Sequence, residues 1–186
     1  MADSTPAARA AGPHLIEVRV RNIGQLFNSM DPSPFIEKEL DAEAEEFIVG
    51  WAKELPPEAD ITLAFHVVDL EDAAVTQALL AGAMTNFFQY KLQATRRRLV
   101  QLTRNGWRDL ARGLLFLAGS IVVANLLEPY AGNPSWAIIK ESVIIGGWVA
   151  MWRPMEIFLY ERWPLQRLCA LYEKLARAPV TVVAAS

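Results

Sequence analysis

The run Gly113–Leu127, GLLFLAGSIVVANLL, carries no charged residue. As an α-helix it would rise about 22 Å, and it is shorter than the roughly 20 apolar residues that a bilayer requires. Extension back to Leu110 completes a span if the guanidinium of Arg112 reaches the headgroups, as long cationic side chains near helix ends can. We therefore predict a first transmembrane helix over about residues 110–130.

A second apolar run, Trp136–Tyr160, follows a short turn-like segment with the sequence EPYAGNPS. Charged residues interrupt this run, but Arg153 and Glu156 are three apart and can pair on one helical face. Pro154 predicts a kink at the same level. We predict a second span over about 136–155, which makes a transmembrane hairpin with the first.

Small residues recur at a spacing of four in both runs. They are Ser120 with Ala124 in the first, and Gly146 with Ala150 in the second. Small side chains at this spacing let two membrane helices approach closely. We expect these four residues to lie between the two helices.

Polar and aromatic residues near the two runs are the candidate functional groups, because ionisable side chains are costly inside a membrane. The polar candidates at the interface or within the membrane are Arg96, Arg97, Arg98, Arg112, Asn125, Glu128, Lys140, Glu141, Arg153 and Glu156. Trp and Tyr prefer the headgroup zones. We expect Trp107, Trp152, Tyr160 and Trp163 at one interface, and Tyr130 and Trp136 at the other.

Basic residues flank the hairpin on one side only. Seven lie from Lys91 to Arg112 and five from Arg153 to Arg177, the end residues included, whereas the connecting segment has none. The positive-inside rule predicts that both termini are cytoplasmic, in a bacterial inner membrane. The arginine cluster is expected to contact anionic headgroups rather than nucleic acid.

The segment GWVAMWRPMEIFLYERWP, Gly147–Pro164, follows the arginine-rich stretch and the first apolar run. Together with LFNSMDPSPF, Leu26–Phe35, these segments resemble a widespread family of small bacterial proteins. The resemblance covers nearly the whole chain. It implies a two-span membrane protein with a cytoplasmic N-terminal domain, and because that family has no assigned activity, it transfers no functional residue.

The N-terminal part predicts a small βαβ arrangement. HLIEVRVRN alternates apolar and polar residues over Leu15–Arg21, and Ile61–Val68 is rich in strand formers, so we expect two parallel strands. The connecting helix is expected to begin after an N-cap at Asp41 and to present an apolar stripe. The stripe is Phe47, Ile48, Trp51 and Leu55.

The C-terminal part predicts helices and one further strand. A long helix from Glu71 is expected to continue toward the membrane, with Gly106 as a break or bend. After the hairpin, an amphipathic helix is expected to stop at Pro179. PVTVV then predicts a short strand that joins the N-terminal sheet.

Catalytic and cofactor signatures are weak. Asn28, Ser29 and Asp31 are a possible binding loop, although a connector that caps its own backbone is the simpler interpretation. His66 is isolated on a strand, and the acidic residues after Asp41 are better explained as a solvated helix face than as a metal site. Cys169 is the only cysteine, which excludes an intrachain disulfide. We predict no cofactor and no metal, and lean against an enzyme.

These observations predict an α+β chain in four parts. They are a disordered tail over 1–13 without a signal peptide, a cytoplasmic α/β domain with a long basic helix over 14–105, the hairpin over 106–160, and an amphipathic helix with a short strand over 161–186. The leading hypothesis is a non-enzymatic inner-membrane protein that docks a partner or forms homo-oligomers among membrane lipids. The alternative is a subunit of an oligomeric transport or permeation assembly, in which the polar candidates line a path.

Overall fold

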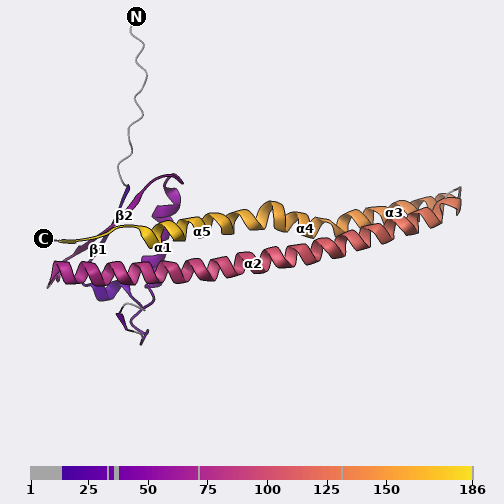
Figure 1. Cartoon of the computed structure of the whole chain (residues 1–186). Helices are drawn as coiled ribbons and strands as arrows, with labels where there is room; N and C mark the ends of the chain where they lie inside the picture. Colours follow the sequence, from indigo (N-terminus) through magenta and orange to yellow (C-terminus); the bar gives the residue numbers. More distant parts are fainter. Residues whose placement is uncertain (1–13, 33, 36–37, 71, 131, 186) are drawn as a thin grey trace, which may run out of the picture. The chain divides into compact units, whose positions relative to one another are not determined.

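The computed structural model describes residues 14–32, 34–35, 38–70, 72–130 and 132–185, and Figure 1 labels its elements. The chain divides into two compact units. The sheet unit comprises the residues up to Gln93 together with those from Ala170 onward, and the helical unit comprises Ala94–Cys169. The tail predicted over 1–13 lies outside the described residues.

The sheet unit contains a three-stranded parallel sheet. Its strands are β1 (His14–Val20), β2 (Ile61–Val67) and β3 (Val180–Ala184), in the order β1-β2-β3. Val18 of β1 pairs with Phe65 of β2, which in turn pairs with Val182 of β3. Both predictions about pairing are confirmed: the first two strands are parallel, and the C-terminal strand joins them.

Three helices contribute to the sheet unit, and contacts join them into one layer. They are α1 (Ala42–Glu54), the first part of α2 (Ala73–Leu127) and the last part of α5 (Arg162–Arg177). Lys91 of α2 forms an ion pair with Glu45 of α1 at 2.8 Å. The ring of Tyr172 of α5 stacks on Phe88 of α2, with 6.3 Å between centroids. The fully buried side chains of this core include Ile48, Leu63, Phe65, Leu80 and Phe88.

This layer covers one face of the sheet. Crossovers between parallel strands are right-handed, and the order β1-β2-β3 makes both crossovers advance in the same direction, so both bring their helices to the same face. Strand side chains on that face, such as Val18 and Phe65, are buried, whereas Leu15 and Val183 on the opposite face are 53% and 46% exposed. We call the opposite face the open face because its two edge strands are exposed, although Ala64 of the central strand is buried there.

Helix α1 begins as the sequence predicts but turns a different face to the core. The carboxylate of Asp41 accepts a hydrogen bond from the backbone N–H of Glu43 at 3.0 Å, as expected for an N-cap. The buried residues are Ile48, Val49 and Ala52. The predicted stripe is wrong at its two aromatic residues, Phe47 and Trp51, which are exposed and contact each other.

The connector between β1 and α1 is closed by its own groups. It begins with the short helix η1 (Ile23–Leu26), and Phe27 then forms an isolated bridge with Leu40. Asn28 accepts a hydrogen bond from the N–H of Met30 at 3.0 Å, and Asp31 accepts one from the N–H of Glu39 at 2.8 Å. Two of the three proposed loop contacts therefore cap the backbone, and the third, Ser29, is exposed.

Helix α2 runs through position 106 without interruption, so the predicted break at Gly106 is wrong. A Cβ atom at position 106 would lie 2.9 Å from Cγ2 of Ile157 and 3.2 Å from Cζ of Phe158. The glycine is therefore required by close packing within the helical unit rather than by a change in the helix axis. The 3-10 turn η3 (Glu128–Tyr130) ends this long element.

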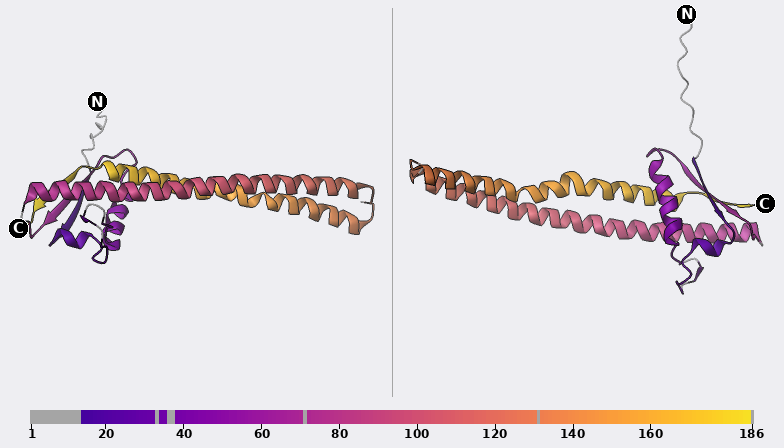
Figure 2. Two further views of the ribbon diagram at one scale, coloured as in Figure 1. Left: turned by 60° about the horizontal axis from the view of Figure 1, so that its bottom comes forward. Right: turned by 180° about the vertical axis from the view of Figure 1, so that it is seen from behind.

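The chain returns through a series of shorter helical segments: α3 (Pro134–Ala150), α4 (Trp152–Glu156), the π-helical turn η4 (Ile157–Glu161) and then α5. Figure 2 shows α3 alongside the later part of α2 in both views. Helix α3 ends four residues before Pro154, which has no N–H to donate to the carbonyl of Ala150. The kink predicted at Pro154 is thus observed as a break, and the second predicted span is not one uninterrupted helix.

Candidate membrane interface

The helical unit exposes many large apolar side chains. On α2 these include Leu114, Leu115, Phe116, Ile121, Val122, Val123 and Leu126. On α3 they include Trp136, Ile138, Ile139, Ile145, Trp148 and Val149. Exposed apolar patches beyond a few hundred Å² are rare on soluble monomers and mark interaction or membrane-binding surfaces. This surface is the candidate functional site of the helical unit.

One helix among the described residues is long and apolar enough to cross a membrane. It is α2 continued through η3, in which an 18-residue stretch has a mean hydropathy of 1.9 and is only 17% buried. Helix α3 has 17 residues, which rise about 26 Å against a hydrocarbon core of about 30 Å. Of the two predicted spans, only the first therefore qualifies by length and composition among the described residues.

Small residues bring α2 and α3 together. Ser120 and Ala124 are 6% and 2% exposed, as expected for residues between the helices. A Cβ atom at Gly147 would lie 2.9 Å from Cβ of Ser120, whereas one at Gly146 would meet nothing within 4 Å. The predicted contact at Gly146 is wrong by one residue, and Gly147 is the close-packed glycine.

A second close contact between α2 and α3 lies at Gly113. A Cβ atom at Gly113 would be 3.0 Å from the carbonyl oxygen of Ala150. That carbonyl lacks its usual helical donor, because the residue four positions later is Pro154. Ala150 therefore contacts α2 as predicted, but through its backbone and opposite a glycine that sequence reasoning did not single out.

The charged candidates form ion pairs inside the helical unit. Lys140 pairs with Glu128 across the turn between η3 and α3. Arg153 pairs with Glu156 at 3.0 Å, as predicted, and also with Glu161 at 2.6 Å. Pairing lowers the cost of holding charges at a membrane interface. The second partner, Glu161, was missed because its distance of eight residues along the chain gives no simple helical signal.

The remaining polar candidates lie on the surface. Arg112 forms an ion pair with Asp109 at 3.0 Å, one turn before the charge-free run begins. Arg96, Arg97 and Arg98 are exposed on α2, as are Asn125 further along it and Glu141 on α3. The structure brings none of these residues together in a single polar cluster within the described part of the chain.

The aromatic candidates occur in two groups. Tyr130 and Trp136 lie on either side of the turn and contact each other, with 5.9 Å between ring centroids. Trp107 contacts Phe158 edge to face at 5.5 Å. Trp152, Tyr160 and Trp163 are exposed on the returning segments. The exposure of these amphipathic rings is compatible with headgroup contact.

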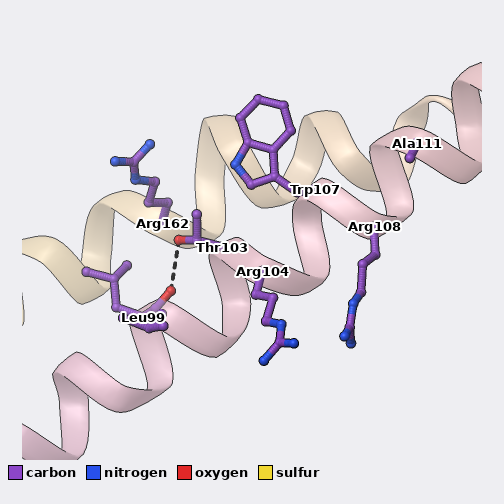
Figure 3. A pocket seen from close by; sticks show the side chains of 8 residues that line it. Leu99, Thr103, Arg104, Trp107, Arg108, Ala111 and Arg162 are labelled. Atoms are coloured by element: carbon purple, nitrogen blue, oxygen red, sulfur yellow. Dashed lines mark hydrogen bonds between the residues drawn. The ribbon is translucent and has the colours of Figure 1, made fainter.

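A hollow of about 690 Å³ lies beside Trp107, and Figure 3 shows the side chains around it. It is lined by Leu99, Val100, Thr103, Arg104, Trp107, Arg108, Ala111 and Arg162. Figure 3 shows Arg104 and Arg108 pointing away from the Trp107 ring, while the hydroxyl of Thr103 donates to the carbonyl of Leu99 at 2.8 Å. The guanidinium groups do not converge, so this hollow is an apolar groove with a basic border rather than a phosphate cage.

Neither similarity to known proteins nor a metal site assigns a function to this chain. Among the described residues, no group of three His, Cys, Asp or Glu side chains could hold a metal ion. Comparison of the chain with protein-family models, curated proteins and solved structures gave no match. Function is therefore inferred from the chain's own surfaces.

Proposed function

We propose that the protein is a non-enzymatic anchor and docking protein of the bacterial inner membrane. In this proposal the later part of α2 inserts together with α3 as a helical hairpin, and the sheet unit remains in the cytoplasm with both termini. The resemblance of Gly147–Pro164 to two-span bacterial proteins supports the same assignment.

The observation that carries the proposal is the exposed apolar surface of α2 and α3. Leu115 is 77% exposed, Leu126 is 68% exposed, and Ile138 is 65% exposed. In water each such side chain forgoes the roughly 1.5–3 kcal/mol that full burial of a large apolar group provides. Insertion into hydrocarbon removes this cost for both helices at once. The short length of α3 is accommodated by local thinning of the bilayer.

Charge pairing supports anchoring rather than conduction. The pairs Glu128–Lys140 and Arg153–Glu156 satisfy charges at the two ends of the α3 region. Paired groups at an interface need no polar path. The alternative of a permeation assembly would require these side chains to face a shared water-filled lumen.

The docking role rests on an exposed aromatic pair in the sheet unit. Phe47 and Trp51 of α1 are 44% and 52% exposed, and their ring centroids lie 6.2 Å apart. Glu43 and Glu54, also exposed, continue the same helical face on either side of them. Aromatic anchors with an acidic border fit a partner that offers apolar and basic groups.

Membrane insertion is tested by a matched pair of variants in α2. Val122→Asp places a charge in the apolar stretch, and Val100→Asp places one at a similarly exposed site on the same helix outside it. An aspartate near the centre of a span costs about 3 kcal/mol relative to valine. We expect the parent and V100D to stay in the membrane pellet after alkaline carbonate extraction, and V122D to be partly released. Release of the parent protein would refute the anchor.

The docking role is tested on protein extracted in mild detergent. We expect chemical cross-linking to give a complex of defined stoichiometry, and Phe47→Ser or Trp51→Ser to abolish it. Leu15→Ser, at an exposed apolar residue on another surface, is the control. A strict monomer, or equal loss of cross-linking in all three variants, would argue against docking through α1.

A further inference from the structure

A polar hollow lies at the carboxyl ends of the three strands, within the sheet unit. Its volume is about 570 Å³, and it is lined by Arg19, Val20, Arg21, Gln25, His66, Val68, Ala184 and Ala185. The order β1-β2-β3 has no point at which the strand order reverses, so the rule that places ligands at such switch points does not apply to this sheet. The side chains that line the hollow are therefore what makes it a candidate binding site independent of membrane anchoring.

The hollow belongs to the open face of the sheet. Arg19 pairs in register with His66, which pairs with Val183, and all three side chains are on the face opposite the buried one. Parallel sheets are normally covered on both faces. The helix layer covers one face of this sheet, so the other presents its polar strand ends to whatever binds there.

The lining is basic. Arg19 and Arg21 contribute two permanent positive charges, and no carboxylate is among the described residues that line the hollow. Gln25 is held in place because its Oε1 accepts the backbone N–H of Arg21 at 3.0 Å, which leaves its amide N–H groups as the remaining donors. Arg19 of β1 and Gln25 of η1 therefore offer an anion hydrogen-bond donors from two different elements.

His66 adds a group whose hydrogen bonding is incomplete. Its Nε2 atom is buried and has no hydrogen-bond partner within the described part of the chain. The nearest acid is Glu17, whose Oε2 lies 3.8 Å from that nitrogen, beyond hydrogen-bond distance. Glu17 does not line the hollow. Buried polar atoms without partners are rare in native proteins and frequently mark functional positions.

We propose that this hollow binds a phosphate group, held between the guanidinium groups of Arg19 and Arg21 with Gln25 and His66 beside it. Arginine recognises both carboxylate and phosphate through paired N–H donors. Two positive charges without a lining carboxylate match a phosphate that carries nearly two negative charges at neutral pH better than a singly charged carboxylate. The ligand is a small phosphate or a compound that carries one.

The test uses the full-length protein in neutral mild detergent, with inorganic phosphate as the probe. Equilibrium dialysis with labelled phosphate is expected to show saturable binding of one phosphate per chain, and sulfate is expected to compete where acetate does not. Arg19→Gln and Arg21→Gln are each expected to weaken binding about tenfold or more, because each removes a charge-assisted contact. Arg167→Gln, at an exposed arginine outside the hollow and outside the arginine cluster of α2, is the control and is expected to bind as the parent does.

Two results would overturn the proposal. One is the absence of saturable binding by the parent protein up to about 10 mM phosphate, which is weaker than any specific site of this kind should be. The other is an equal loss of binding in R167Q and R19Q, which would show general attraction to positive charge. Arg19 and Arg21 are both exposed, and the hydrogen bond to Gln25 comes from the backbone N–H of Arg21, so we expect R19Q and R21Q to retain the fold.

Discussion

Substitution of Gly147 by alanine tests the close packing of α2 and α3 at its tightest point. The added Cβ atom would lie 2.9 Å from Cβ of Ser120 and 3.0 Å from Cδ1 of Leu117. Carbon atoms in favourable contact are about 3.5–4.0 Å apart, so the helices must separate by roughly 0.5 Å or more. The Cβ atom of Ser120 is fixed to the backbone and cannot rotate away.

The magnitude follows from two opposing terms. Overpacking of a well-packed contact costs about 1–3 kcal/mol, whereas alanine in place of glycine within a helix gains about 1 kcal/mol. Gly146→Ala is the matched control, because a Cβ atom there meets nothing within 4 Å and brings only the gain. We therefore expect G147A to be about 1–3 kcal/mol less stable than G146A.

The assay is the free energy of unfolding of the full-length protein, measured by far-ultraviolet circular dichroism as SDS is titrated into mild-detergent micelles. Both substitutions lie in the same helix, so differences in helix propensity between micelle and water cancel in the comparison. Equal stability of the two variants would refute the packing of α3 on Ser120, and a less stable G146A would indicate that the helix is rotated by one residue.

Three further predictions concern the sheet unit. Burial raises the pKa of Tyr172 above its usual value of about 10, and the carboxylate of Glu45 adds to this effect. The stability that the neutral phenol contributes is therefore present below about pH 10 and lost as the pH rises through the raised pKa. Tyr172→Phe should flatten this alkaline decline in the free energy of unfolding. Deletion of residues 180–186 removes β3 from the sheet and should lower the melting temperature, whereas an unchanged melting temperature would mean that β3 does not contribute. Phe88→Ala should cost about 3–5 kcal/mol because the ring is fully buried, while Tyr90→Ala, two residues later and 54% exposed, should cost far less in the same thermal melts.

The strands were predictable because their signal is local. Ile16 and Val18 alternate with polar residues, and a period of two places them on one face whatever lies opposite. The same logic extends to β3, whose Val180 is buried while Val183 is exposed. Pairing followed from the rule that strands joined by a helix are parallel neighbours.

Helix faces were harder to predict because several rotations fit the sequence equally well. In α1, Phe47 and Trp51 are the largest apolar residues, but the core takes Val49 and Ala52 instead. Glu45 precedes Val49 and Ala52 by about one and two helical turns and forms an ion pair with Lys91 of α2, which favours the observed rotation. A contact with a residue 46 positions away leaves no trace in the local pattern.

The glycines illustrate the same limit. Gly146 and Gly147 are adjacent and equally suited to close packing, and only the position of Ser120 distinguishes them. Gly106 suggested a bend because glycine weakens helices, yet Ile157 fills the space that its missing side chain leaves. The hollow around Arg19 and His66 could not be predicted either, because its lining comes from all three strands.

Membrane insertion is tested most directly by asking whether the turn between α2 and α3 crosses the bilayer. In a Cys169→Ser background, Gly132→Cys places a thiol in the exposed turn, and Val68→Cys places one on an exposed site of the sheet unit. We expect a membrane-impermeant maleimide to label the thiol at position 132 on intact spheroplasts, and the thiol at position 68 only after lysis. Labelling of both thiols only after lysis would contradict insertion across the bilayer.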